Sequence, residues 1–255
     1  ENWERNTLYS FNVVSTISQA MRKRTLSKGV RPEHTYLLPN WVNLNEIKQQ
    51  TQVEKELNPY RKELDIAKDD IVLLYSGSMN KKQGLEMLVD VIKELKDVPK
   101  LKWLLAGEGP TKSGLADKIE GLADVSLLTL QPPERMNDWL NLADIHLLPQ
   151  KGDAVDLVLP SKLLGILASG RPLVASSTEG SELGIVAEQA GIRVDPEDAP
   201  GFARAIRKLV SSQDLRSRLG VNGRKIAELR YGEDVVLLEF EKEILSILSH
   251  SRAKS

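Results

Sequence analysis

Glycines and lysines are concentrated in residues 76–84, Ser-Gly-Ser-Met-Asn-Lys-Lys-Gln-Gly, where an apolar run ends and a helical pattern begins. Gly77 and Gly84 allow the backbone to approach a ligand closely, and the start of a helix offers unpaired N–H groups at the positive end of its dipole. Lys82 and the preceding Lys81 add positive charge. These residue types in this order are typical of a diphosphate site, although an ordinary solvated turn explains them equally well.

A second loop, residues 153–162 (Asp-Ala-Val-Asp-Leu-Val-Leu-Pro-Ser-Lys), also leads into a predicted helix. Carboxylates such as Asp156 bind sugar hydroxyls by accepting hydrogen bonds, whereas Lys162 and the helix N–H groups at Ser161 can bind phosphate. A lysine in the first turn of a helix opposes the helix dipole, so its presence indicates an anion nearby. The alternative is a solvated lysine that binds nothing.

Other polar positions give weaker signals. Gly107 belongs to a Gly-Glu-Gly-Pro turn that lacks the G-x-G-x-x-G spacing, so a nicotinamide dinucleotide fingerprint is not supported. His146 lies inside a predicted strand, where a histidine satisfied within the core is more common than a catalytic one. The sequence has no cysteine and its three histidines lie far apart, so we expect no metal site.

The elements that must position these loops alternate strictly from about residue 70. Apolar runs predict strands at 71–75, 101–106, 125–130, 145–148, 173–175 and 192–194, and helical spacing predicts helices at 85–95, 115–122, 134–142, 161–168 and 182–189. Six short strands separated by helices predict an α/β, Rossmann-like parallel sheet with helices on both faces. Ligands of such sheets bind at the carboxyl ends of the strands, where both loops lie.

Composition narrows the class of protein. The net charge of −1 gives no general attraction to nucleic acid. The apolar runs are of strand length, far below the roughly 20 residues of a membrane span. The first residue is Glu1 rather than Met, and the opening segment is charged, which indicates that the sequence starts inside a longer protein.

We divide the chain into four segments. Residues 1–45 hold a strand–helix–strand pattern (13–17, around 21–26, and 35–38) that is too small to bury a core alone, so we interpret it as the tail end of a preceding domain. Residues 46–69 are polar and are predicted to form a linker with a connecting helix. Residues 70–225 hold the sheet, and residues 226–255 hold an amphipathic helix predicted to pack back toward the N-terminal part.

Eight stretches of the sequence, in this order, resemble the C-terminal half of the large retaining glycosyltransferase family with two facing Rossmann-like domains (GT-B, family 4-like). The resemblance is strongest to its colanic-acid-biosynthesis-like members and covers nearly the whole chain. The stretches are 17–21 (Ile-Ser-Gln-Ala-Met), 38–42 (Leu-Pro-Asn-Trp-Val), 75–84, 105–109 (Leu-Ala-Gly-Glu-Gly), 143–149 (Ala-Asp-Ile-His-Leu-Leu-Pro), 159–162 (Leu-Pro-Ser-Lys), 167–174 (Leu-Ala-Ser-Gly-Arg-Pro-Leu-Val) and 194–196 (Val-Asp-Pro).

The resemblance implies that residues 70–225 hold a nucleotide-sugar donor, while the acceptor site belongs to an N-terminal domain that this portion lacks. This portion alone is therefore expected to be inactive. The loop with Gly77 and Gly84, together with Lys82 and Lys162, would stabilise charge on the departing diphosphate without a divalent metal. Gln131 follows the third strand, where the family contacts the base through backbone groups.

Two departures from the family pattern concern charged residues. The family commonly has Gly-Arg-x4-Lys-Gly in its first loop, and here Ser78 takes the arginine position and Gln83 the lysine position. Its two glutamates, eight residues apart, correspond to Leu157 and Gly165. Asp156 lies one residue before the first of these positions and can bind the sugar. Because the colanic-acid-like members carry Pro-Ser-Lys instead, we interpret this departure as a subgroup trait.

The implied reaction transfers a glycosyl unit, with retention, from a nucleoside diphosphate sugar to a saccharide or lipid-linked saccharide in bacterial exopolysaccharide biosynthesis. A GDP- or UDP-sugar is favoured, with no further cofactor, in the cytoplasm or in peripheral association with the inner membrane face. One alternative is a sugar-nucleotide epimerase of the same fold, although it would need acid–base histidines, which are scarce here. Another is a binding module in which the missing glutamates mark lost catalysis.

Overall fold

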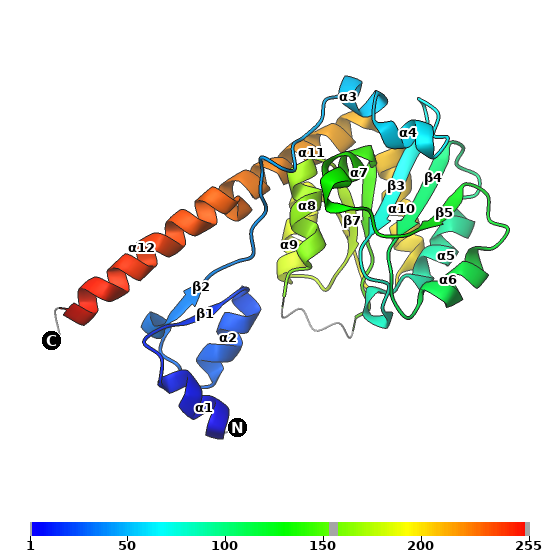
Figure 1. Ribbon diagram of the computed structural model, residues 1–255. Helices are drawn as coiled ribbons and strands as arrows, with labels where there is room; N and C mark the ends of the chain where they lie inside the picture. The colour runs from blue at the N-terminus through cyan, green and yellow to red at the C-terminus, as the bar shows by residue number, and fades with distance from the viewer. Residues whose placement is uncertain (1, 153–157, 253–255) are drawn as a thin grey trace.

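The computed structural model describes residues 2–152 and 158–252. Its main body is a sheet of six parallel strands in the order β5-β4-β3-β6-β7-β8 (Figure 1). The order reverses beside β3, which pairs with both β4 and β6, as in doubly wound folds. The strands are β3 (Ile71–Ser76), β4 (Leu101–Ala106), β5 (Val125–Leu128), β6 (Ile145–Leu148), β7 (Leu173–Ser176) and β8 (Gly191–Val194). The predicted Rossmann-like sheet is confirmed.

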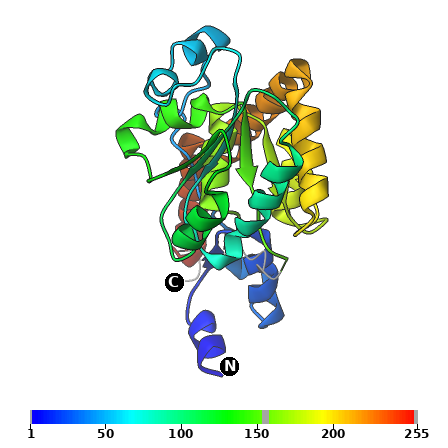
Figure 2. The same ribbon diagram turned by 90° about the vertical axis from the view of Figure 1, so that its right-hand side faces the viewer.

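Helices cover both faces of this sheet, as Figures 1 and 2 show. Along β3, Leu73 and Tyr75 are buried on one face, whereas Val72 and Leu74 are buried on the other, the alternation that a pleated strand produces. The first face packs on α5 (Glu86–Glu94), α6 (Lys112–Ile119) and α10 (Ala199–Val210), and the second on α4 (Pro59–Glu63) and α7 (Met136–Leu142). A third apolar cluster joins β7 to α8 (Ser161–Ser169) and α9 (Glu182–Ala190).

The third strand of the sheet is shorter than predicted. β5 ends at Leu128 rather than at residue 130, and Leu130 is 50% exposed. Two prolines follow at 132 and 133, and a proline has no N–H to donate to a neighbouring strand. The chain instead turns through the 3-10 helix η3 (Pro133–Arg135) into α7.

The polar segment predicted to contain one connecting helix contains two short helices, α3 (Gln52–Glu56) and α4, so that prediction was wrong. Pro59 breaks the helical pattern because a proline disfavours helical backbone in the residue before it. Asn58 accordingly has a ψ of 127° and caps α4 by accepting a hydrogen bond from the Tyr60 N–H. The Asn58 amide also donates to the Asp138 carbonyl of α7 at 2.7 Å, which holds the segment against the sheet domain.

Residues 2–37 form a small unit that lies beneath α12 (Glu233–Arg252) in Figure 1, and the chain after them packs on the sheet domain through Val42 and Leu44. It consists of α1 (Asn2–Tyr9), β1 (Val14–Thr16), α2 (Gln19–Ser27), η1 (Pro32–His34) and β2 (Thr35–Leu37), with β1 and β2 parallel. The predicted strand–helix–strand pattern is confirmed. The unit contacts α12 through the rings of Tyr36 and Phe240, 6.2 Å apart, and Val42 bridges to Gly232 at the start of that helix.

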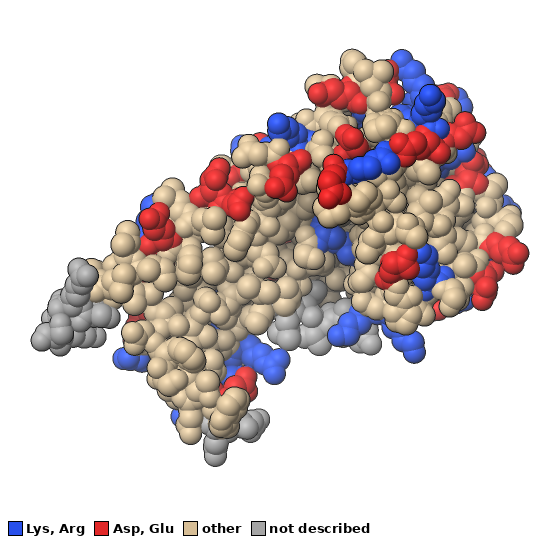
Figure 3. All heavy atoms as spheres, viewed as in Figure 1, with Lys and Arg blue, Asp and Glu red and all other residues tan. Residues whose placement is uncertain are grey.

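The C-terminal part of the sheet domain ends in α11 (Gln213–Ile226) and a π-helical turn at Ala227–Tyr231, after which α12 leaves the domain. In Figure 3, acidic and basic side chains lie mixed along the upper rim over α12, α3 and α4, and the face below that rim is largely uncharged. Within the part of the chain that is described, no helix combines the length and apolar character needed to cross a bilayer.

Candidate functional site

A pocket of about 300 Å³ lies at the carboxyl edge of the sheet, next to the point where the strand order reverses. Its walls come from the loop after β3, the residue at 130 after β5, the face of α7 and the first turns of α8. The lining residues are Ile47, Ser76, Gly77, Leu130, Met136, Leu140, His146, Ser161, Lys162, Gly165 and Ile166. The fold thus brings together four residues predicted from different loops: Gly77, Ser161, Lys162 and Gly165.

Lys162 is the principal charged group of this pocket. Its Nζ lies 3.0 Å from the Tyr75 hydroxyl and 2.6 Å from Oε1 of Gln83, and it stands 4.2 Å from the centre of the Tyr75 ring. Burial lowers the pKa of Lys162 to about 7. Among the described residues, no carboxylate forms an ion pair with it. A half-buried ammonium with only neutral partners favours an anionic ligand, which would restore the lost solvation.

The N-terminus of α8 adds donors beside Lys162. This helix follows Pro160, whose side chain provides no capping hydrogen bond, and it ends at Gly170, which has a left-handed φ of 66°. Its first-turn N–H groups therefore carry the positive end of the helix dipole toward the pocket. Because Gly77 has a φ of 146°, and a Cβ there would lie 3.0 Å from Nζ of Lys162, glycine is needed where the two loops meet.

Three other predicted residues support the loop after β3 without lining the pocket. Gly84 has a φ of 61° and closes the 3-10 turn Lys81–Gln83. A Cβ on Gly107 would approach the Gly77 carbonyl oxygen to 2.1 Å, so this glycine is required for packing between the two loops. Ser78 is exposed, and its backbone carbonyl accepts a 2.5 Å hydrogen bond from the Tyr75 hydroxyl.

Of the remaining predicted residues that the structure describes, Gly165 lines the pocket, whereas Lys82 and Gln131 do not. Lys82 is exposed on the 3-10 turn. Gln131 is half-buried, and its Oε1 accepts a hydrogen bond from the Tyr60 hydroxyl at 2.8 Å. Gly165 lines the pocket against Leu140, where a Cβ would lie 3.0 Å from the Leu140 Cδ1. Asp156 and Leu157 lie outside the described residues.

Sequence reasoning missed the aromatic residues under the site. Tyr75 is fully buried, and nothing in its strand pattern separated it from an ordinary core residue. Trp139 of α7 donates from Nε1 to the Ser76 hydroxyl at 3.1 Å and packs edge-on against Tyr60. The Arg135 guanidinium covers the other side of Tyr60, 3.9 Å from the ring centre. Through Tyr75 and Trp139, which contact the lining residues Lys162 and Ser76, these rings form an aromatic floor to the pocket.

His146 lines the pocket from β6 as a core residue. It is 1% exposed and its Nε2 lies 3.1 Å from the Leu140 carbonyl oxygen. Burial lowers the pKa of His146 to about 3, so the ring is neutral at physiological pH. The prediction of a satisfied core histidine is confirmed. No group of three or more side chains suited to a metal ion occurs among the residues that the structure describes.

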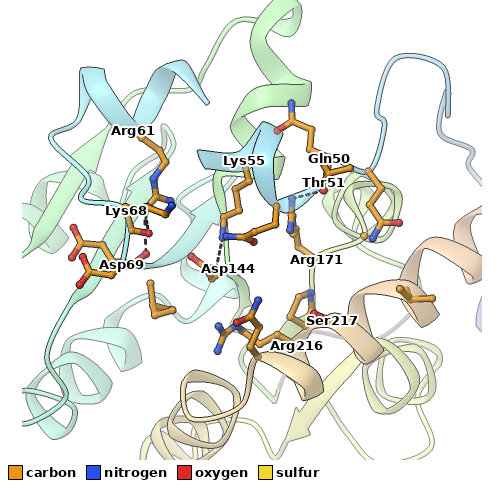
Figure 4. Close-up of a pocket in the computed structure, with 18 residues that line it drawn as sticks. Gln50, Thr51, Lys55, Arg61, Lys68, Asp69, Asp144, Arg171, Arg216 and Ser217 are labelled. Carbon is orange, nitrogen blue, oxygen red and sulfur yellow. Dashed lines mark hydrogen bonds and ion pairs between the residues drawn. The ribbon is translucent and has the colours of Figure 1, made fainter. Parts of the chain in front are cut away.

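A second pocket, of about 370 Å³, lies at the opposite, amino edge of the strands, next to Ile71 and Pro172 (Figure 4). It is rich in charges, and most of these have partners within the protein, although the buried Nε of Arg171 has none among the described residues. The Lys55 ammonium pairs with Asp144, and the Arg171 guanidinium donates to the Gln50 carbonyl at 2.9 Å. Because ligands of this fold class bind at the carboxyl edge, where Gly77 and the N-terminus of α8 also meet, we assign the site to the pocket at Lys162.

Comparisons with known proteins identify the family of the chain. Residues 70–212 match the family model described as "Glycosyl transferases group 1". The chain is 31% identical to the Escherichia coli (strain K12) protein named as colanic acid biosynthesis glycosyl transferase WcaI, over 95% of this chain and 59% of that protein. It therefore spans less than two thirds of that relative. It is also 24% identical to the teichuronic acid biosynthesis glycosyltransferase named TuaC of Bacillus subtilis (strain 168), over 80% of this chain and 48% of that protein.

Solved structures show the same fold at low sequence identity. A sucrose-phosphate synthase from Thermosynechococcus elongatus superposes with a TM-score of 0.79 at 19% identity, covering 97% of this chain and 61% of that one. Anabaena HepE, solved in complex with UDP-glucose, superposes with a TM-score of 0.77 at 16% identity, covering 95% of this chain and 68% of that one. Because the family model matches more than half of the chain, the protein belongs to the group 1 glycosyl transferases.

Proposed function

We propose that this chain binds the nucleoside diphosphate sugar donor of a glycosyl transfer reaction in the pocket at Lys162. The observation that carries the proposal is the half-buried Lys162 ammonium, which lies beside Gly77 at the N-terminus of α8 without a carboxylate partner among the described residues. Helix N–H groups and a lysine at one spot suit two linked phosphates better than any neutral ligand.

In the proposed reaction, the bond between the anomeric carbon and the diphosphate oxygen breaks as the oxygen of an acceptor hydroxyl bonds to that carbon, and the hydroxyl proton passes to the departing diphosphate. Negative charge then builds up on the departing diphosphate. Lys162 and the α8 N–H groups stabilise that charge, and Lys82 contributes a solvent-screened cation from the neighbouring turn. Gln131, next to the aromatic floor, is proposed to contact the base. The group-transfer step itself needs an acceptor hydroxyl held opposite this pocket.

Finer features of the reaction belong to the same proposal. We favour a UDP- or GDP-sugar as donor, supported by the UDP-glucose complex of the HepE fold neighbour. A saccharide acceptor in polysaccharide biosynthesis is supported by the names of the bacterial relatives. A lipid-linked acceptor and association with a membrane surface are proposed from the sequence resemblance alone. Retention of anomeric configuration is proposed from the sequence resemblance and can be read from the product by NMR.

Calorimetric titration of the chain with UDP, GDP, ADP and their sugars tests the proposal. We expect at least one nucleoside diphosphate to bind, and the matching free nucleoside to bind much more weakly, because it lacks the groups that contact Lys162. Equal affinity for nucleoside and nucleoside diphosphate would show that the phosphates do not lie at Lys162. Uptake of none of these compounds would reject the donor-binding function.

A further inference from the structure

The hydrogen bonds around Lys162 have a fixed direction. The Tyr75 hydroxyl lies 2.5 Å from the Ser78 carbonyl oxygen and 3.4 Å from Oε1 of Gln83, so its single proton goes to the nearer acceptor. The Tyr75 oxygen is then left as an acceptor toward Lys162 at 3.0 Å. The amide oxygen of Gln83 can only accept, and it takes a second N–H of Lys162 at 2.6 Å.

An ammonium group has three N–H bonds, and two of them are thus committed within the protein. The ring face of Tyr75, with its centre 4.2 Å away, provides further favourable but neutral surroundings. The third N–H has no hydrogen-bond partner among the described residues and lies beside the pocket that Lys162 lines with Gly77.

We infer that Tyr75 and Gln83 are positioning residues, which hold the Lys162 ammonium by two neutral acceptors and leave its third N–H for the donor diphosphate. This inference rests on the proposed function. Neutral acceptors suit the task, because a carboxylate at the same place would pair with the ammonium and compete with the phosphates. Ser78 contributes through its backbone carbonyl, which accepts the hydrogen bond of the Tyr75 hydroxyl and so orients it.

The arrangement has a consequence for the charge of Lys162. Each neutral acceptor solvates the ammonium and therefore opposes the effect of burial on its pKa. Removing one acceptor should lower the pKa of Lys162 below about 7, whereas a carboxylate should raise it. If Tyr75 and Gln83 only filled space, removing an acceptor and introducing a carboxylate would not shift the pKa of Lys162 in opposite directions.

The test uses Tyr75→Phe, Gln83→Met and Gln83→Glu in the whole chain, with titrations of UDP and GDP at pH 7.5 to 9. We expect Tyr75→Phe and Gln83→Met each to weaken binding by about 5-fold or more at pH 7.5, the size of one hydrogen bond to a charged group. In a lysine side-chain NMR titration, Lys162 of both variants should lose its proton at lower pH than in the wild type. Gln83→Glu should weaken binding by roughly 10-fold and abolish the fall of affinity up to pH 9.

Tyr231→Phe is the matched control, because it also removes a hydroxyl from a buried tyrosine. This hydroxyl has no hydrogen-bond partner within the described part of the chain, and Tyr231 does not line this pocket. It should bind as the wild type does. A lysine side-chain NMR titration of the free protein measures the pKa of Lys162 without any ligand. If the wild type binds a nucleoside diphosphate but Tyr75→Phe and Gln83→Met leave its affinity and the Lys162 titration unchanged, the positioning role is wrong. If the wild type binds none, the proposed function falls, and with it the diphosphate as ligand, whatever the titration shows.

Discussion

Replacing Lys162 by Met should have two opposite effects, on ligand affinity and on stability. Met keeps most of the apolar stem and removes the charge. The loss of one charge-assisted contact to phosphate should weaken nucleoside diphosphate binding by about 1.5–3 kcal/mol, or roughly 10- to 150-fold. Lys82→Met provides the comparison, because Lys82 is exposed and water screens its charge. That variant should lose only about 3-fold or less.

The pH dependence follows from the pKa of Lys162, which burial lowers from 10.5 to about 7. Between pH 7.5 and 9 the phosphates are fully ionised, since their second pKa is near 6, while the free protein loses the Lys162 proton. Wild-type affinity should fall about 20-fold across that range, and the Met variant should show no such fall.

The free energy of unfolding should rise when Lys162 is replaced by Met, although the affinity for nucleoside diphosphate falls. Between pH 7 and 10.5 the unfolded chain holds a proton that folded Lys162 lacks, so the free energy of unfolding rises with pH in that window. At pH 7 the buried charge costs roughly 2–4 kcal/mol, and Lys162→Met should recover part of it in urea unfolding. A Met variant that binds nucleotide like the wild type, or that is less stable than the wild type at pH 7, would refute this account of the site.

Three further substitutions test the framework. Lys55→Met leaves Asp144 without its buried partner and should lower the free energy of unfolding by about 3 kcal/mol in urea, whereas Lys55→Met combined with Asp144→Asn should regain most of it. Gly107→Ala should cost roughly 1–3 kcal/mol and weaken nucleotide binding, because its methyl group would meet the Gly77 carbonyl; Gly114→Ala, with open space around it, should not destabilise. Neutral His146, with a pKa of about 3 against 6.5 unfolded, should make the protein less stable as pH falls from 6.5 toward 3, and unfolding of His146→Gln followed by circular dichroism should show a shallower acid slope.

The sheet and the meeting of its loops could be predicted from the sequence, because both follow from local patterns. Apolar runs between helical segments fix a parallel sheet, and its carboxyl edge necessarily brings the turn at Gly77 close to the helix that starts at Ser161. The break between α3 and α4 also follows from a local pattern, because Pro59 itself signals that a single helix cannot form there.

The partners of Lys162 could not be predicted in the same way. Gln83 lies 79 positions away in the sequence, and its contact depends on the distance between the β3 loop and α8, which no local pattern encodes. Tyr75 alternates with its neighbours as a core residue should, and it is fully buried. Only the position of its hydroxyl, at the end of the strand and within 2.5 Å of the Ser78 carbonyl, makes it part of the site.

The contact between Gln83 and Lys162 also bears on the missing cation of the first loop. The resemblance places a lysine at position 83, where this chain has the amide whose Oε1 lies 2.6 Å from Nζ of Lys162. Two ammonium groups about 4 Å apart would repel by roughly 4 kcal/mol at a dielectric constant of 20, so a buried lysine at each position is unfavourable. We therefore expect this contact to hold one ammonium group, which a lysine at position 83 or a lysine at position 162 can supply. Gln83→Lys alone should lower the free energy of unfolding, whereas the exchange Gln83→Lys with Lys162→Gln should restore stability and hold nucleoside diphosphate affinity within about 10-fold of the wild type. An exchanged variant that binds no better than Lys162→Gln alone would show that the ammonium must come from α8 itself.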